Sequence, residues 1–114
     1  MDFVWWKKIK LLPGATDDTI YTEIQYDQES KQIVNFVVIQ LYEHNRVVYE
    51  IKKHDCAHGK YHVHHYYEGI HSKVIETTEP VAPELFRNAR KDILENWFNY
   101  RMRYVRKYLN DPLN

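Results

Sequence analysis

The segment Ile33–Tyr42 reads IVNFVVIQLY and is the most apolar run of the chain. It is rich in β-branched residues, which favour strands, and both of its faces are largely apolar. Strands that are apolar on both faces are typically buried within a sheet. We therefore expect Ile33–Tyr42 to be a central strand around which the rest of a sheet is arranged.

Four further segments on either side of this run have the patterns of strands, and each is separated from the next by a short polar turn. They are Thr19–Tyr26, Arg46–His54, Tyr61–Tyr67 and Ile70–Thr77. Four successive hairpin-type connections predict an antiparallel meander of five strands. Before them, the segment Met1–Leu12 fits a short helix and a short strand almost equally well, because periodicity does not decide over so few residues.

A long helix is expected after the sheet. Pro83 suits the first turn of a helix, and Glu84 suits its positive end. Apolar residues then recur at steps of three or four, which produces one continuous stripe. They are Phe86, Ala89, Ile93, Trp97, Tyr100, Tyr104 and Tyr108. The predicted fold class is α+β: a five-stranded antiparallel meander with one long C-terminal helix, Pro83 to about Leu109, packed on one face.

Composition limits the class of protein. The 114 residues are 44% apolar and 28% charged, which is typical of a single globular domain spanning residues 1–114. The formal net charge of zero argues against a protein that coats nucleic acid non-specifically. The lone Cys56 excludes an intrachain disulfide and favours a reducing compartment. The N-terminal apolar run is too short to span a membrane and lacks the order of a signal peptide, so we expect a cytoplasmic protein without a membrane role.

Five of the seven histidines lie between residues 52 and 67. If Val63 faces the core, strand alternation places His62 and His64 on the open face of the sheet. The same alternation on the preceding strand places Lys52 and His54 opposite Val47, Tyr49 and Ile51. The sequence therefore predicts one cluster at the end of a hairpin, formed by His54, Asp55, His58, His62, His64 and Tyr66.

Three interpretations of this cluster compete. The first is acid–base catalysis without a metal, in which imidazoles exchange protons and Lys52 or Lys53 stabilises an anion. RNA cleavage suits this chemistry because the ribose 2′-hydroxyl is a built-in nucleophile. The second is a metal site around His62-x-His64, which no Cys-x-x-Cys or His-Glu-x-x-His motif supports. The third is a structural role, since histidines and tyrosines on a strand are often solvated or part of an interface.

The end of the predicted helix is basic and aromatic. Arg101, Arg103, Arg106 and Lys107 follow one another with no acidic residue before Asp111. These cations complement the helix dipole, and phosphate contact is the functional alternative. The broad aromatic face of the helix favours either packing on the sheet or a homodimer.

The segment Lys53-His54-Asp55-Cys56-Ala57-His58-Gly59-Lys60-Tyr61-His62 resembles a “basic-x-Asp-x-Ala-His-Gly-x-x-His” element of small uncharacterised bacterial and archaeal proteins. The segment Ile93–Arg101 is similar to the end of those proteins. More distantly, the layout resembles the TumE-type toxin component of toxin–antitoxin pairs, with Lys53-x-Asp55 in the place of Arg-x-Asp and Cys56 in the place of an asparagine. The resemblance implies a nucleic-acid-directed activity and a protein partner.

Together these observations predict a toxin-like, metal-independent ribonuclease that needs no cofactor. The predicted catalytic residues are His58, His62, His64, Asp55 and Lys53. The predicted substrate-binding residues are Lys52, His54, Tyr66 and Arg101. The expected partners are RNA, an antitoxin-like protein and a second copy of the chain in a homodimer. The alternatives are a non-enzymatic interaction protein that dimerises through the aromatic helix, and a histidine-ligated metal site.

Overall fold

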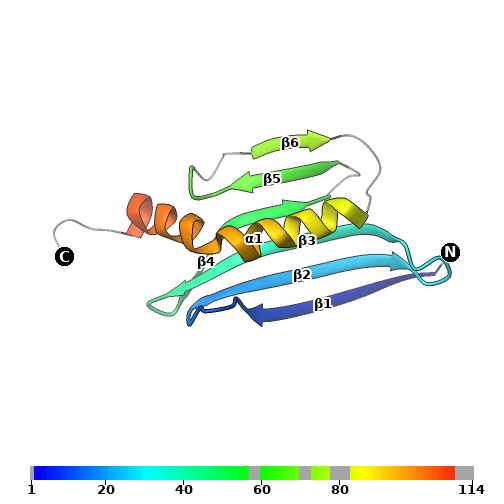
Figure 1. Cartoon of the computed structure of the whole chain (residues 1–114), viewed down its shortest axis with the longest axis horizontal. Coiled ribbons are helices and arrows are strands. Elements are labelled where there is room, and N and C mark those ends of the chain that lie inside the picture. Colours follow the sequence, from blue (N-terminus) through cyan, green and yellow to red (C-terminus); the bar gives the residue numbers. More distant parts are fainter. Residues whose placement is uncertain (1, 57–59, 70–72, 78–82, 110–114) are drawn as a thin grey trace.

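The computed structural model describes residues 2–56, 60–69, 73–77 and 83–109. They form one antiparallel sheet and one long helix that lies across a face of it (Figure 1). The strands are β1 (Phe3–Leu11), β2 (Asp18–Asp27), β3 (Ile33–His44), β4 (Val47–Asp55), β5 (Tyr61–His65) and β6 (Lys73–Thr77). The helix α1 (Pro83–Tyr104) continues into a π-helical turn, η2 (Val105–Leu109).

The predicted fold class is confirmed. The strands are arranged in chain order, β1-β2-β3-β4-β5-β6, and each pairs antiparallel with the next. The five predicted strands correspond to β2–β6. The segment that the sequence left undecided is β1, which pairs with β2 along its full length and makes a sixth strand at the edge of the sheet.

A tight hairpin joins the two central strands. Asn45 and Arg46 both have positive φ, at 52° and 68°. Two successive positive φ values between paired strands are typical of a type I′ turn, whose twist matches that of the strands. The turn sets the register His44–Val47 and Tyr42–Tyr49 between β3 and β4.

The core lies between the sheet and α1. Phe36, Val38 and Val63 from the sheet pack with Ala89 and Ile93 from the helix, and all five are buried. Towards the end of the helix, Tyr100 and Tyr104 pack against a second buried cluster, formed by Tyr42, Ile51 and Tyr67. The apolar stripe of the helix therefore packs against the sheet of the same chain.

The helix covers only the middle of the sheet. It packs mainly on β3 and β4, with β2 and then β1 to one side of it, and Ile20 of β2 reaches the core beneath the helix (Figure 1). Within the described residues, no helix is long and apolar enough to cross a membrane.

Candidate active site

A break in the pairing of β3 with β4 decides where the candidate residues point. Gln40 pairs with Lys52 and Leu41 pairs with Glu50, so Ile51 has no partner on β3. An extra residue of this kind is a β-bulge, and it shifts the alternation of the strand by one position. Ile51 and Lys52 therefore both face the helix, and the two strand halves on either side of the bulge alternate out of phase.

Beyond the bulge, β4 and β5 present two different sets of side chains on their two faces. Asp55 pairs with His62 and Lys53 pairs with His64, so these four residues share the face away from the helix. His54 pairs with Val63 and Lys52 pairs with His65, on the face that the helix covers. Directly opposed residues in an antiparallel pair point to the same side of a sheet.

The open face carries a group that we call the Asp55 cluster: Lys53, Asp55, His62, His64 and Tyr66. Asp55 Oδ1 lies 3.6 Å from His62 Nδ1, and Asp55 Oδ2 lies 3.4 Å from His64 Nε2. Lys53 Nζ is 3.9 Å from Asp55 Oδ2. One carboxylate thus stands between two imidazoles, with an ammonium group beside it.

The rings of the Asp55 cluster are held by one another. The His64 and Tyr66 rings are stacked, with centroids 5.5 Å apart, and the His62 and His64 rings meet edge to face at 6.4 Å. The side chain of Asp55 is 7% exposed, whereas those of His62 and His64 are 12% and 22% exposed. The carboxylate is therefore the most covered of the three side chains, and the His64 imidazole is the most exposed.

The helix side carries a second group, the Asp92 network, formed by Lys52, His54, Tyr61, Asp92 and Tyr100. Asp92 Oδ2 contacts Lys52 Nζ at 2.6 Å and His54 Nε2 at 2.9 Å. The Tyr100 hydroxyl donates to Asp92 Oδ1 at 2.5 Å and accepts from Lys52 Nζ at 3.1 Å. His54 Nδ1 lies 2.6 Å from the Tyr61 hydroxyl.

The charges in the Asp92 network stabilise one another. Burial by itself would raise the pKa of Asp92, but hydrogen bonds from His54, Lys52 and Tyr100 outweigh burial and hold the pKa well below its ordinary value. Because an ionised carboxylate only accepts hydrogen bonds, His54 Nε2 is the donor to Asp92. The network is a set of short, matched contacts that ties the helix to β4.

The structure corrects the prediction that Lys52 and His54 join the histidine cluster. They lie on the opposite face of the sheet, because the bulge at Ile51 reverses the alternation on which that prediction relied. Arg101 is also on the helix side, with Nε 3.4 Å from Asp18 Oδ1 and its guanidinium over the Tyr42 ring. His58 lies outside the described residues, so the structure brings together His62, His64, Asp55, Lys53 and Tyr66 of the predicted site.

Two further points concern the reactivity of Cys56 and the alternative of a metal site. Cys56 is buried, and burial raises the pKa of its thiol to about 12, so it is not a thiolate nucleophile. Within the described part of the chain, His, Cys, Asp and Glu do not form a group of three or more that could hold a metal ion.

Sequence reasoning missed the role of Asp92, which lies 38 residues from His54 along the chain. One signal was present: Asp92 is an acidic residue beside Ile93 on the apolar stripe of the helix, and such a residue usually has a buried cation as its partner. Lys52 and His54 cannot be identified as those partners from the sequence, because only the bulge at Ile51 turns them towards the helix.

A domain of unknown function, DUF7718, matches residues 14–109 of the chain. The protein therefore belongs to the DUF7718 family. No curated protein and no solved structure matches the chain significantly.

Proposed function

We propose that the protein is a metal-independent endoribonuclease and that the Asp55 cluster is its active site. The observation that supports this most is the position of Asp55 between the imidazoles of His62 and His64, at 3.6 and 3.4 Å. Two imidazoles on one carboxylate can act as an acid and a base, while the carboxylate orients both rings and stabilises whichever of them is charged.

The reaction that fits this arrangement is transesterification of RNA. One imidazole removes the proton of the ribose 2′-hydroxyl, whose oxygen attacks the adjacent phosphorus. The other imidazole donates its proton to the leaving 5′-oxygen, so the products are a 2′,3′-cyclic phosphate and a 5′-hydroxyl. In the proposed mechanism Lys53, beside Asp55, stabilises the negative charge that develops on the phosphate. Tyr66, stacked on His64, holds a phosphate oxygen.

The Asp55 cluster suits catalysis better than the Asp92 network. Proton transfer requires an imidazole that can reach a substrate, and His64 retains 22% of its side-chain exposure whereas His54 retains 5%. His54 also has both ring nitrogens engaged, one by Asp92 and one by Tyr61. We therefore assign the Asp92 network to the stability of the fold.

The proposed partners follow from the proposed site. RNA is the substrate, and an antitoxin-like protein would act by covering the open face of β4 and β5. The free thiol of Cys56 supports a cytoplasmic setting. A homodimer through the aromatic helix has less support, because Tyr100 and Tyr104 of the stripe pack against the sheet of the same chain.

The test is cleavage of a fluorogenic single-stranded RNA by the purified protein in the presence of EDTA. We expect wild-type protein to cleave it and to leave a 2′,3′-cyclic phosphate. Replacing both His62 and His64 by alanine should lower the cleavage rate by about 10²- to 10⁴-fold, the usual contribution of acid–base groups.

His65→Ala is the matched control, because His65 belongs to the same strand but faces the helix. It should retain cleavage within a few-fold of wild type, and thermal melting should show all variants folded. Undiminished cleavage by the double variant, or no cleavage by wild type, would refute the proposal. Loss of wild-type activity in EDTA would refute the metal-independent mechanism.

A further inference from the structure

One helix is too narrow to cover a sheet of six strands. Strands about 4.8 Å apart make such a sheet about 24 Å wide, whereas a helix with its side chains is about 10 Å across. Because α1 packs on β3 and β4, the helix-side surface of β1 and β2 remains beside it. A cleft of about 350 Å³ lies there, between these two strands and the first turns of α1. Pockets for small molecules measure about 300–1,000 Å³, so the cleft is the size of one small ligand.

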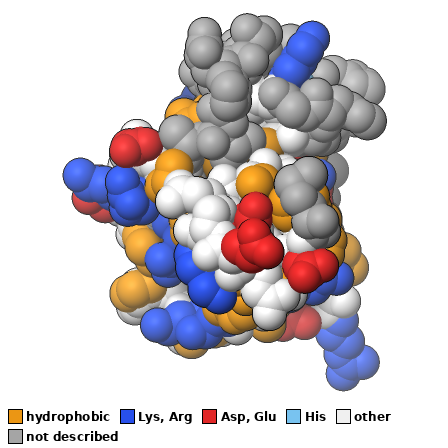
Figure 2. Space-filling view, turned by 90° about the vertical axis from the view of Figure 1, so that its right-hand side faces the viewer, with side chains coloured by type: hydrophobic (Ala, Val, Ile, Leu, Met, Phe, Trp, Pro, Cys, Tyr) orange, Lys and Arg blue, Asp and Glu red, His pale blue; other side chains and the backbone are white. Residues whose placement is uncertain are grey.

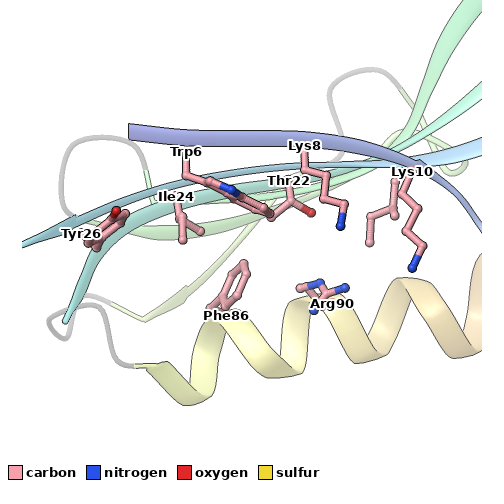
Figure 3. A pocket seen from close by; sticks show the side chains of 9 residues that line it. Trp6, Lys8, Lys10, Thr22, Ile24, Tyr26, Phe86 and Arg90 are labelled. Atoms are coloured by element: carbon pink, nitrogen blue, oxygen red, sulfur yellow. The ribbon is translucent and has the colours of Figure 1, made fainter. Parts of the chain in front are cut away.

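The cleft has an apolar floor, an aromatic side and a cationic side. Ile20, Thr22 and Ile24 of β2 form the floor. The aromatic residues are Trp6, Tyr26 and Phe86, and the cationic residues are Lys8, Lys10 and Arg90. Figure 3 shows the labelled side chains of β1 and β2 pointing towards the helix, and Phe86 and Arg90 on the helix across from them. The aromatic residues gather towards the Tyr26 end and the lysines towards the Lys10 end.

Among the described residues, the three cations have no acidic partner. Within the part of the chain that the structure describes, none of them has a carboxylate within ion-pairing distance, and no acidic residue lines the cleft. Arg90 instead lies over the Phe86 ring, 6.0 Å from its centroid. Figure 2 shows basic side chains next to hydrophobic ones along the lower flank of this end of the molecule. Three cations converging on one concave surface favour an anionic ligand.

The aromatic side of the cleft indicates the rest of the ligand. Trp6 is 42% exposed, although it pairs with Ile24, which packs against the core. Its indole and the Phe86 ring flank a space above the apolar floor (Figure 3). Aromatic faces next to cations are the usual surface for a planar base that carries a phosphate, because the base stacks while the cations neutralise the phosphate.

We propose that this cleft binds a nucleoside monophosphate. The base lies against Trp6 and Phe86, and the phosphate meets Lys8, Lys10 and Arg90. The same chemistry is offered by a free nucleotide and by the 5′-phosphorylated end of an RNA chain. The cleft is on the helix side of the sheet and the Asp55 cluster is on the other side, so this site does not depend on the proposed ribonuclease activity.

Calorimetric titration of the full chain with AMP, CMP, GMP and UMP tests the proposal. At least one nucleotide should bind more tightly than inorganic phosphate, which lacks a base, and more tightly than octanoate, which lacks a ring. A 5′-phosphorylated RNA tetranucleotide distinguishes the two sources. Binding about tenfold tighter than that of the mononucleotide assigns the site to an RNA end, and equal or weaker binding assigns it to a free nucleotide.

The strand β1 offers matched control variants, because neighbouring residues point to opposite faces. Lys8→Gln combined with Lys10→Gln should weaken nucleotide binding by about tenfold or more, whereas Lys7→Gln should change it by less than about twofold. Trp6→Ala should likewise weaken binding by about tenfold, and Trp5→Ala should leave it unchanged. No binding of any mononucleotide, equal losses in the control variants, or octanoate binding as tight as nucleotide would each overturn the proposal.

Discussion

The two faces of the β4–β5 hairpin carry similar residues in different arrangements. On each face a carboxylate is accompanied by a lysine and at least one histidine. Asp92 on the helix side contacts Lys52, His54 and Tyr100 at 2.5 to 2.9 Å. Asp55 on the open side stands 3.4 to 3.9 Å from its histidine and lysine neighbours.

This difference separates a structural ion pair from a candidate catalytic one. Short charge-assisted hydrogen bonds hold a carboxylate in its ionised form and stabilise the fold. An imidazole must reach a substrate to exchange a proton with it, and His64 is more exposed than His54. Residue type alone therefore does not identify the candidate active site, because both faces contain the same types.

The largest effect on stability should come from Asp92→Asn. This change leaves Lys52, whose side chain is 6% exposed, without its counter-charge. Removing one partner of a buried pair typically costs about 3–5 kcal/mol, and the partial exposure of Asp92 places the expected loss near 3 kcal/mol. Urea unfolding followed by circular dichroism would measure it.

Asp55→Asn is the matched comparison, and we expect it to cost about 1 kcal/mol because Lys53, which is 28% exposed, loses less with its counter-charge than the buried Lys52 does. Asp55 is more buried than Asp92, so burial alone predicts the opposite order. Equal or greater destabilisation by Asp55→Asn would contradict the division into a structural and a catalytic face.

Asp18, also on the helix side, differs from Asp92 in how its contribution to stability depends on pH. It is fully buried, and burial raises its pKa from 3.8 to about 6, although the Arg101 guanidinium opposes the shift. The folded protein therefore binds more protons at Asp18 than the unfolded chain does between about pH 4 and 6, so its contribution to stability increases as the pH falls through that range. Asp92 has the opposite sign: its lowered pKa gives stability above its ordinary value of 3.8, and that stability is lost as the pH falls further.

Asp18→Asn should therefore raise the free energy of unfolding at pH 7 by about 1–2 kcal/mol, because an amide avoids the cost of burying a charge. The gain should shrink between pH 6 and pH 4, where the native carboxyl becomes protonated in the folded protein. Unfolding titrations of both proteins at pH 4, 5, 6 and 7 would show this convergence. A constant difference across that range would mean that Asp18 does not titrate there.

The smallest expected effect compares two tyrosines. Tyr100→Phe removes a hydroxyl that donates to Asp92 and accepts from Lys52, and should cost about 1 kcal/mol. Tyr66→Phe keeps the ring that stacks on His64 and should cost less than about 0.5 kcal/mol. Comparing the thermal unfolding midpoints of the two variants shows which substitution costs more stability. A larger loss for Tyr66→Phe would place the structural network on the open face.

The local pattern of the chain determined much of the fold. Alternation and turn residues predicted the strands β2–β6, and Pro83 with the apolar stripe predicted the helix and its packed face. The same alternation correctly placed His62 and His64 together, away from Val63. These features follow from the sequence because each depends on residues that are close together in it. The edge strand β1 was not determined in this way, since its short segment satisfies two periodicities.

The tertiary structure alone decided which side of the sheet each candidate residue occupies. One unpaired residue, Ile51, moved Lys52 and His54 to the helix side, because a single extra residue reverses every later side chain of a strand. It also brought them to Asp92, which comes from the helix. A bulge arises from how two strands pair and has no signal within one of them. The sequence therefore determined which residues could carry chemistry, and strand pairing determined which of them stand together.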